Sequence, residues 1–241
     1  MSYLIYLFFG LAPSIIWLLF FLRKDAHPES NSMILKIFFY GMLITLPVAF
    51  LEIGFHAELK LLNLSPLLFL VIYAFLGIGL VEEIFKYLIV RKNVLKNPEF
   101  DEPIDIMLYM IIAALGFAAA ENLLILFPLL RPFQLFPTLA VSALRFVGAT
   151  FLHALASGLI GYFLALSIFE SKNYLKLLAK GLFVAIVLHG LYDFSIMEIE
   201  GSYKFLIPVA ILIGLAIFVS RGFQKVKKIK SICLPESRQV K

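Results

Sequence analysis

The chain has 241 residues, of which 62% are hydrophobic and 15% charged, and its mean hydropathy is +0.97. Soluble domains are about 45–50% apolar and about 25% charged, so this composition excludes a water-soluble globule, a disordered chain and a secreted disulfide scaffold. The net charge is +5, and the single cysteine, Cys233, permits no intrachain disulfide. The composition predicts a multi-pass protein of the cell membrane.

Apolar stretches long enough to cross a bilayer recur along the chain. A transmembrane helix needs about 20 mostly apolar residues, and the strands of a membrane barrel would alternate polar and apolar residues, which these stretches do not do. The first stretch lacks the basic start of a signal peptide, so we expect it to be retained. We predict an all-α transmembrane bundle of about seven spans, within a range of six to eight, at residues 3–22, 34–55, 66–90, 104–127, 138–169, 177–197 and 205–220.

Basic residues are distributed unevenly between the loops. Sixteen Lys and Arg belong to the first, third and fifth loops with their flanking span ends and to the C-terminal tail, against only Lys60, Arg131 and Lys204 on the other side. Positively charged loops stay in the cytoplasm, so we predict an external N-terminus and a cytoplasmic C-terminus. We expect a single integral membrane domain over residues 1–241, with a catalytic core at about 66–197.

The basic tail at residues 221–241 has a simple explanation. It would anchor the last helix and contact anionic lipid, at roughly 1 kcal/mol per basic residue near the membrane surface. The tail lacks the folded module and the interleaved aromatic residues that are typical of nucleic-acid binding. We therefore predict the lipid bilayer, and no nucleic acid, as its partner.

The most informative residues are the ionisable side chains within the spans. An acid or a base at the centre of a membrane helix costs roughly 2.5–3.5 kcal/mol, so such residues normally face the bundle interior and serve a pathway or a reaction. They cluster on the third to sixth spans, and we expect nothing comparable on spans one, two and seven. With their polar neighbours they are Glu82, Glu83, Lys86, Glu121, Asn122, Arg145, His153, His189 and Asp193.

The depth of these residues follows from the helical rise. At about 1.5 Å per residue, Glu82 lies about 13 Å and His189 about 17 Å from the cytoplasmic edge. Asp193 lies one turn from His189 on the same face, and His153 falls within the long fifth span. We expect Glu82, His153 and His189 to meet near mid-membrane, with Glu121 nearer the external edge unless its helix is tilted or broken.

Structural roles would explain several of these residues singly. Lys86 has the helical spacing to pair with both Glu82 and Glu83, although adjacent side chains point about 100° apart. His153 alone is typical of a hydrogen-bonded core histidine. His189 could pair with Asp193 to stabilise their helix, and Arg145 could pair with Glu121 and Asn122 on a neighbouring helix. The convergence of carboxylates and imidazoles on three helices favours a reactive site over these separate explanations.

The residue types suit peptide hydrolysis. This reaction needs an activated water, a base that takes its proton, and positive charge at the developing oxyanion. Glu82 beside Glu83 suits general base and acid, and His153 and His189 suit oxyanion donors or metal ligands. Asp193 would orient His189 or add an oxygen ligand. The candidate metal ligands are thus Glu82, His153, His189 and Asp193, and zinc and metal-free glutamate chemistry both stay open because no His-Glu-x-x-His motif is present.

The motifs also carry a family resemblance over about residues 80–193. They are EEIFK at 82–86, EPID at 102–105, GFA at 116–118, EN at 121–122, His153, and HGLYD at 189–193. Together they resemble the PrsW family of bacterial and archaeal intramembrane proteases, which is similar to the CAAX prenyl endopeptidases and bacteriocin-processing enzymes. Lys86 follows the second Glu by three residues, whereas the CAAX group usually carries Arg four residues after it. This departure favours the PrsW branch and argues against a prenylated substrate.

The resemblance implies roles for these residues. Its catalytic set is Glu82, Glu83, His153, His189 and Asp193, with Glu121 and Asn122 as a PrsW-like addition. It also implies substrates that are membrane-anchored regulators such as anti-sigma factors. Lys86, Glu121, Asn122 and Arg145 would support the catalytic residues.

We therefore predict an intramembrane endopeptidase. The alternatives are a proton-coupled transporter, in which buried Glu, His and Asp relay protons, and a non-catalytic membrane scaffold. Transporters usually show internal repeats and paired broken helices, and the sequence shows neither clearly.

Overall fold

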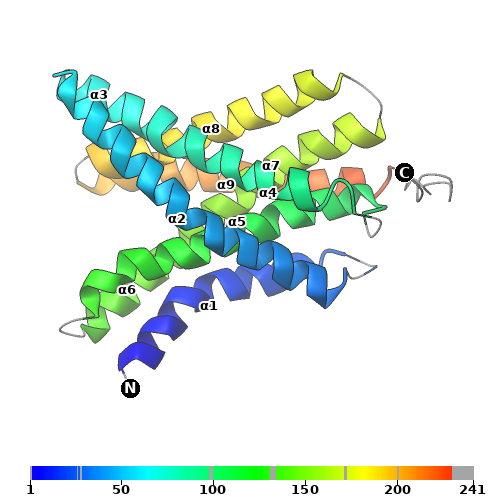
Figure 1. The fold of residues 1–241 in the computed structure, drawn as a ribbon, viewed down its shortest axis with the longest axis horizontal. Coiled ribbons are helices and arrows are strands. Elements are labelled where there is room, and N and C mark those ends of the chain that lie inside the picture. Colours follow the sequence, from blue (N-terminus) through cyan, green and yellow to red (C-terminus); the bar gives the residue numbers. More distant parts are fainter. Residues whose placement is uncertain are drawn as a thin grey trace.

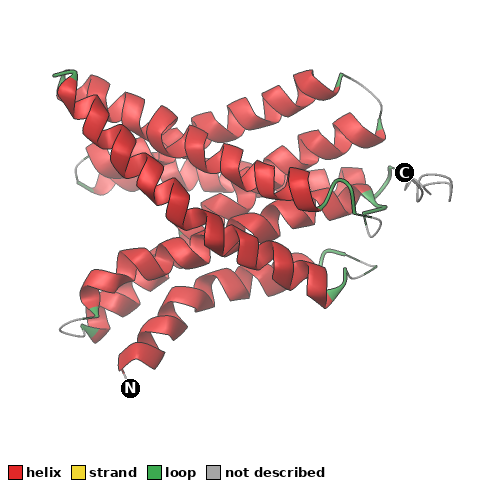
Figure 2. Ribbon diagram, viewed as in Figure 1, coloured by secondary structure: helices red, strands yellow, loops and turns green. Residues whose placement is uncertain are grey.

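The computed structural model describes residues 2–25, 27, 29–97, 100–130, 134–170, 173–199 and 201–229. The regular elements of these residues are all helices (Figure 2). Seven helical segments are long and apolar enough to cross a membrane, which confirms the predicted class and number of spans. They are Tyr3–Leu22, Asn31–Leu61, Pro66–Asn93, Pro103–Leu129, Leu135–Phe169, Tyr174–Glu198 and Tyr203–Val226.

Four of these spans contain more than one helical element. The elements in chain order are α1 (Ser2–Leu22), α2 (Asn31–Leu61), α3 (Pro66–Ile72), the π-helical η1 (Tyr73–Leu80), α4 (Val81–Asn93), α5 (Pro103–Leu126), the short η2 (Phe127–Leu129), α6 (Leu135–Val147), α7 (Ala149–Phe169), α8 (Tyr174–Glu198), the short η3 (Ser202–Phe205) and α9 (Leu206–Val226). The third span thus runs through α3, η1 and α4, and the fifth through α6 and α7.

The helices alternate in direction across the bundle. α1 begins at the left end in Figure 1 and α9 ends at the right end, as an odd number of spans requires. The last turns of α1, α4 and α7 and the first turns of α2, α5 and α8 also lie at the right end (Figure 1). We call this the basic end, because it carries Arg23, Lys24, Arg91, Lys92 and Lys227. Arg131, Lys172 and the tail residues 230–241, which contribute to the predicted charge asymmetry, lie outside the described residues.

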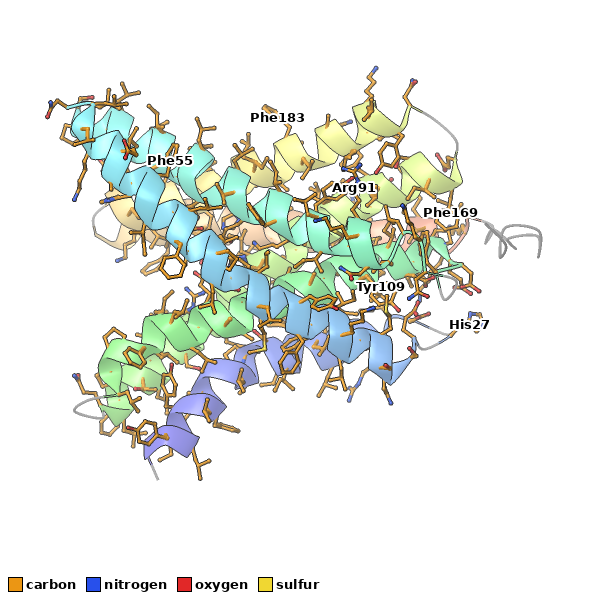
Figure 3. The ribbon with its side chains drawn as sticks, viewed as in Figure 1. His27, Phe55, Arg91, Tyr109, Phe169 and Phe183 are labelled. Carbon is orange, nitrogen blue, oxygen red and sulfur yellow. The ribbon has the colours of Figure 1, made fainter. Side chains whose placement is uncertain are left out.

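α5 and α7 form the interior of the bundle. Most of their residues are buried, whereas large apolar side chains on other helices, such as Phe50 and Phe183, face outward; Phe183 projects from the outer side of α8 in Figure 3. Glycine lets α2 approach α5 closely: a Cβ at Gly116 would lie 2.0 Å from the carbonyl oxygen of Phe38. Such small-residue contacts replace the hydrophobic driving force that is missing between helices in lipid.

Two irregularities lie beside the predicted site residues. The π-helical segment η1 ends immediately before α4, whose first turn carries Glu82 and Glu83. The fifth span, which we predicted as one helix, breaks at Gly148, where φ is −105° and ψ is −101°. This joint between α6 and α7 separates Arg145 from His153. π-helical segments are frequent at functional sites. Both irregularities, η1 and the break at Gly148, lie close in sequence to predicted site residues.

Candidate active site

The predicted acids and histidines come together inside the bundle. Glu82 and Glu83 start α4, His153 lies in α7 and His189 in α8. One ligand atom from each of these four buried side chains lies within 4.8 Å of those of the other three. The imidazole rings of His153 and His189 have centroids 5.1 Å apart. Residues that are distant in the sequence therefore form one compact acid–imidazole cluster.

Lys86 supplies a cation at the centre of this cluster. Its Nζ donates hydrogen bonds to Glu82 Oε2, Glu83 Oε1 and His153 Nδ1, each at 2.8 Å. The side chain is fully buried, and Nζ also lies 4.6 Å from the centroid of the Phe117 ring. An ammonium group has three protons, so these three acceptors use its whole donor capacity. Lys86 thus forms the ion pairs with Glu82 and Glu83 that its helical spacing allows, and these pairs are part of the site.

The partners of the two imidazoles determine where the protons lie. Because Nδ1 of His153 accepts from Lys86, its proton is on Nε2, which donates to Glu121 Oε2 at 2.8 Å. His189 donates from Nδ1 to Glu83 Oε1 at 2.8 Å. Its Nε2 lies 3.3 Å from Asp193 Oδ2 and 3.8 Å from Glu82 Oε2. Each imidazole is therefore held by a carboxylate at one nitrogen and presents the other nitrogen to the cluster.

The predicted supporting residues also contact the site. Arg145 pairs through Nη2 with Glu121 Oε2 at 2.6 Å and donates from Nε to Asn122 Oδ1. Asn122 in turn donates to Thr150 Oγ1 at 3.2 Å, next to the α6–α7 joint. Glu121 lies five residues before the end of an unbroken α5. Its Oε2 reaches Nε2 of His153 at 2.8 Å because α5 packs against α7.

A cavity of about 480 Å³ opens beside the cluster. Its walls carry Glu82, Glu121, Arg145, His153, His189 and Asp193. Glu83 and Lys86 are fully buried behind this wall, so the two adjacent glutamates have different positions. The cavity is also lined by Leu144 and Val147 of α6 and Val209 of α9, which are about half exposed. It therefore reaches the lipid-facing surface between α6 and α9, away from the basic end.

Two contributors were not predicted from the sequence. The expectation that the second span carries no comparable ionisable group is wrong, because Glu52 of α2 lines this cavity. Its Oε1 is buried and has no hydrogen-bond partner among the described residues. The cost of a lone acid in an apolar span was the signal for it. Ser157 of α7 is the second contributor, and it donates to Glu83 Oε2 at 3.3 Å.

The donors of the cluster fit a metal ion such as zinc. Zinc takes imidazole nitrogen and carboxylate oxygen ligands, and Glu82 Oε2, His153 Nδ1 and His189 Nε2 are of these kinds. Ligating histidines in proteins usually donate their other ring N–H to a carboxylate. The described contacts have this arrangement, since Glu83 holds His189 and Glu121 holds His153.

Comparisons with known proteins identify the family of the chain. A family model described as PrsW family intramembrane metalloprotease matches residues 29–220, which include every predicted site residue. Protease PrsW of Geobacillus kaustophilus is 29% identical over 231 residues, which cover 95% of this chain and 93% of that protein. Protease PrsW of Bacillus subtilis is 29% identical over 225 residues, which cover 92% of this chain and 94% of that protein.

A third relative, Protease PrsW of Halalkalibacterium halodurans, is 31% identical over 185 residues, or 76% of this chain and 80% of that protein. No solved structure matches the chain. The family match covers most of the chain and favours a protease over a proton-coupled transporter. The chain belongs to the PrsW family of intramembrane metalloproteases.

Proposed function

We propose that this protease hydrolyses peptide bonds of membrane-anchored proteins, with anti-sigma-factor-like regulators as the substrate class. The observation that carries the proposal is the cavity between α6 and α9, which joins the acid–imidazole cluster to the lipid-facing surface. A substrate segment leaving the bilayer would reach the cluster there without crossing the bundle. The cavity accommodates a short stretch of extended chain.

Glu82 is the general base in this proposal. It faces the cavity and is fixed by Lys86. Its carboxylate takes a proton from water as the oxygen attacks the peptide carbonyl carbon, and the proton passes to the leaving amine as the C–N bond breaks. Glu83 is a positioning residue, because it is fully buried and holds His189 through Nδ1. A base of this kind contributes about 10²- to 10⁴-fold to the rate.

The histidines would help to stabilise the negative charge that develops on the substrate carbonyl oxygen, through a metal ion or directly. Glu82, His153 and His189 would hold a metal ion, with Asp193 beside His189, and a bound ion polarises water and the substrate carbonyl. Lys86 donates to two of these donor atoms, so the ammonium and a metal ion compete for them. Without a metal ion, an oxyanion would be met by Nε2–H of a doubly protonated His189, because Lys86 and the other imidazole N–H groups already donate within the site.

The orientation of the bundle determines on which side of the membrane the substrate would be cleaved. We propose that the basic end faces the cytoplasm, because positively charged loops remain there. The N-terminus is then external, and the cavity opens in the outer half of the membrane. Cleavage would occur where the substrate enters the bilayer from outside. The whole chain forms one integral membrane domain, and Glu52 extends its catalytic core from residues 66–197 to α2.

The test is cleavage of a tagged single-span substrate in proteoliposomes. Glu82→Gln keeps the size of the side chain and removes the base, so we expect cleavage to fall at least about 100-fold. Glu58→Gln is the matched control, because Glu58 is exposed on α2 and does not line the cavity; it should retain the wild-type rate. A Glu82→Gln protein that cleaves at the wild-type rate would refute the assigned base.

A further inference from the structure

A second cavity, of about 610 Å³, lies between α1, α9 and the α6–α7 joint. It differs from the active-site cavity in that its described lining residues include no carboxylate and no imidazole. Its aromatic residues are Trp17, Phe20, Phe21, Phe146, Phe151 and Phe223. Its volume is within the range of about 300–1,000 Å³ that is typical of small-molecule sites. An apolar cavity in a membrane bundle is suited to a hydrocarbon chain.

The polar residues of this cavity gather at the basic end. Lys24 is the second residue after α1, and Lys227 directly follows α9. Nζ of Lys24 lies 4.6 Å from the centroid of the Phe20 ring. Among the described residues, neither lysine forms an ion pair with a carboxylate. Two cations without counter-ions therefore border the mouth of an apolar cavity.

We propose that this cavity binds one anionic phospholipid, with an acyl chain along the aromatic wall and the phosphate at Lys24 and Lys227. Ile16 at the inner part of the cavity is eight residues from Lys24, so the cavity extends roughly 12 Å along α1. Lysines extend from helix ends to the level of the headgroups, and basic pockets between transmembrane helices bind anionic headgroups. A zwitterionic lipid would not supply the net negative charge that two lysines attract.

The occupied cavity would support the α6–α7 joint. Phe146 and Phe151 line the lipid cavity, whereas their neighbours Arg145 and His153 line the active-site cavity. Trp17 stacks on Phe151 with ring centroids 4.0 Å apart and donates from Nε1 to the carbonyl oxygen of Phe146 at 2.8 Å. A lipid packed against these rings would stabilise the joint from behind. Any effect on cleavage rests on the proposed function, but lipid binding does not.

The test measures lipid binding to the full-length protein in neutral detergent, without substrate, by native mass spectrometry and by thermal shift. We expect phosphatidylglycerol to bind and to raise the melting temperature, and phosphatidylcholine to do neither. Lys24→Gln with Lys227→Gln should weaken phosphatidylglycerol binding about 30-fold, because each basic residue contributes about fivefold. Lys36→Gln with Lys228→Gln removes the same charge at the same end outside the cavity, and should leave the affinity unchanged.

A second variant separates the cavity from its charge. Ala216→Phe places a ring in the cavity and keeps both lysines, so it should prevent binding without lowering the melting temperature of the lipid-free protein. Glycerol phosphate, which has the charge without acyl chains, should not compete. Equal binding of the two lipids, an unchanged affinity after loss of Lys24 and Lys227, or competition by glycerol phosphate would each overturn the proposal. Because no substrate is present, these outcomes are independent of whether the protein cleaves peptides.

Discussion

The bundle contains two groups of clustered carboxylates that are stabilised in different ways. In the active site, Glu82 and Glu83 lie against the ammonium of Lys86, and Glu121 lies against the guanidinium of Arg145. These groups are surrounded by apolar helices. In such a setting a charge is tolerated only when it is paired and hydrogen-bonded.

The second group lies at the basic end. Carboxylate oxygens of Asp25, Glu29 and Asp105 lie within 4.8 Å of one another. Their described partners are hydrogen-bond donors instead of cations. Asp105 accepts from the backbone N–H groups of residues 101 and 102 at 3.2 and 2.8 Å, and Glu29 accepts from the hydroxyl of Tyr109 at 2.6 Å.

The difference shows what each group does. Asp105 forms a capping box with Glu102 at the start of α5, where acids also interact favourably with the helix dipole. Hydrogen bonds suffice there, because the group lies at an end of the bundle. The active-site group has no such helix end to cap and depends on cations. Variants that remove a partner should therefore be most harmful in the active site.

Removal of Lys86 should have the largest effect. Lys86→Met leaves Glu82 and Glu83 buried without their cation, and breaking a buried pair in this way costs about 3–5 kcal/mol. We expect a large fall in melting temperature and loss of cleavage. Lys36→Met, at an exposed lysine that also lies near an aromatic ring, should change neither. If Lys86→Met is as stable as the wild type, a metal ion supplies the charge, and metal analysis of the purified variant would detect it.

Replacement of Glu52 should change stability less than replacement of Lys86, and it should stabilise the protein. Its Oε1 is buried without a partner, and an unsatisfied buried polar atom costs about 1–3 kcal/mol. Glu52→Leu should therefore raise the melting temperature. It should also raise KM for the substrate more than it changes kcat, because the carboxyl faces the cavity without contacting the cluster through any described hydrogen bond. Glu58→Leu on the same helix should leave KM unchanged; a Glu52→Leu protein with wild-type KM would remove Glu52 from substrate binding.

The sequence was sufficient for the class of fold and for the number of spans, because both depend on long apolar stretches. It could not show the π-helical η1 or the break at Gly148. These depend on tertiary contacts such as the approach of η1 to α8, where a Cβ at Gly190 would lie 2.9 Å from the Cα of Phe75. Hydropathy carries no signal of such contacts.

Most residues of the site could also be predicted from the sequence, because each acid or base within an apolar span is costly. The contacts between them could not all be predicted. Helical spacing identifies the contacts of Lys86 with Glu82 and Glu83, which are on its own helix. The contact of Glu121 with His153 depends on how α5 packs against α7. Glu52 was missed because it lies three residues from the end of the predicted span 34–55, without a motif around it.

The smallest expected effect concerns Glu29, in the group at the basic end. Burial raises the pKa of the half-buried Glu29 carboxyl above its ordinary value of 4.5, and the nearby Asp25 and Asp101 raise it further, against the hydrogen bond from Tyr109 that lowers it. The folded protein therefore holds this proton more tightly than the unfolded chain. The stability from Glu29 is complete below its unfolded pKa and decreases as pH rises through its folded pKa. The glutamine of Glu29→Gln cannot lose a proton. The melting temperature of this variant should therefore rise relative to that of the wild type as pH increases from about 4 to neutral. Melting curves across this range, with Glu58→Gln as the exposed control, would show the gain, and a difference that does not vary with pH would mean that Glu29 titrates alike in both states.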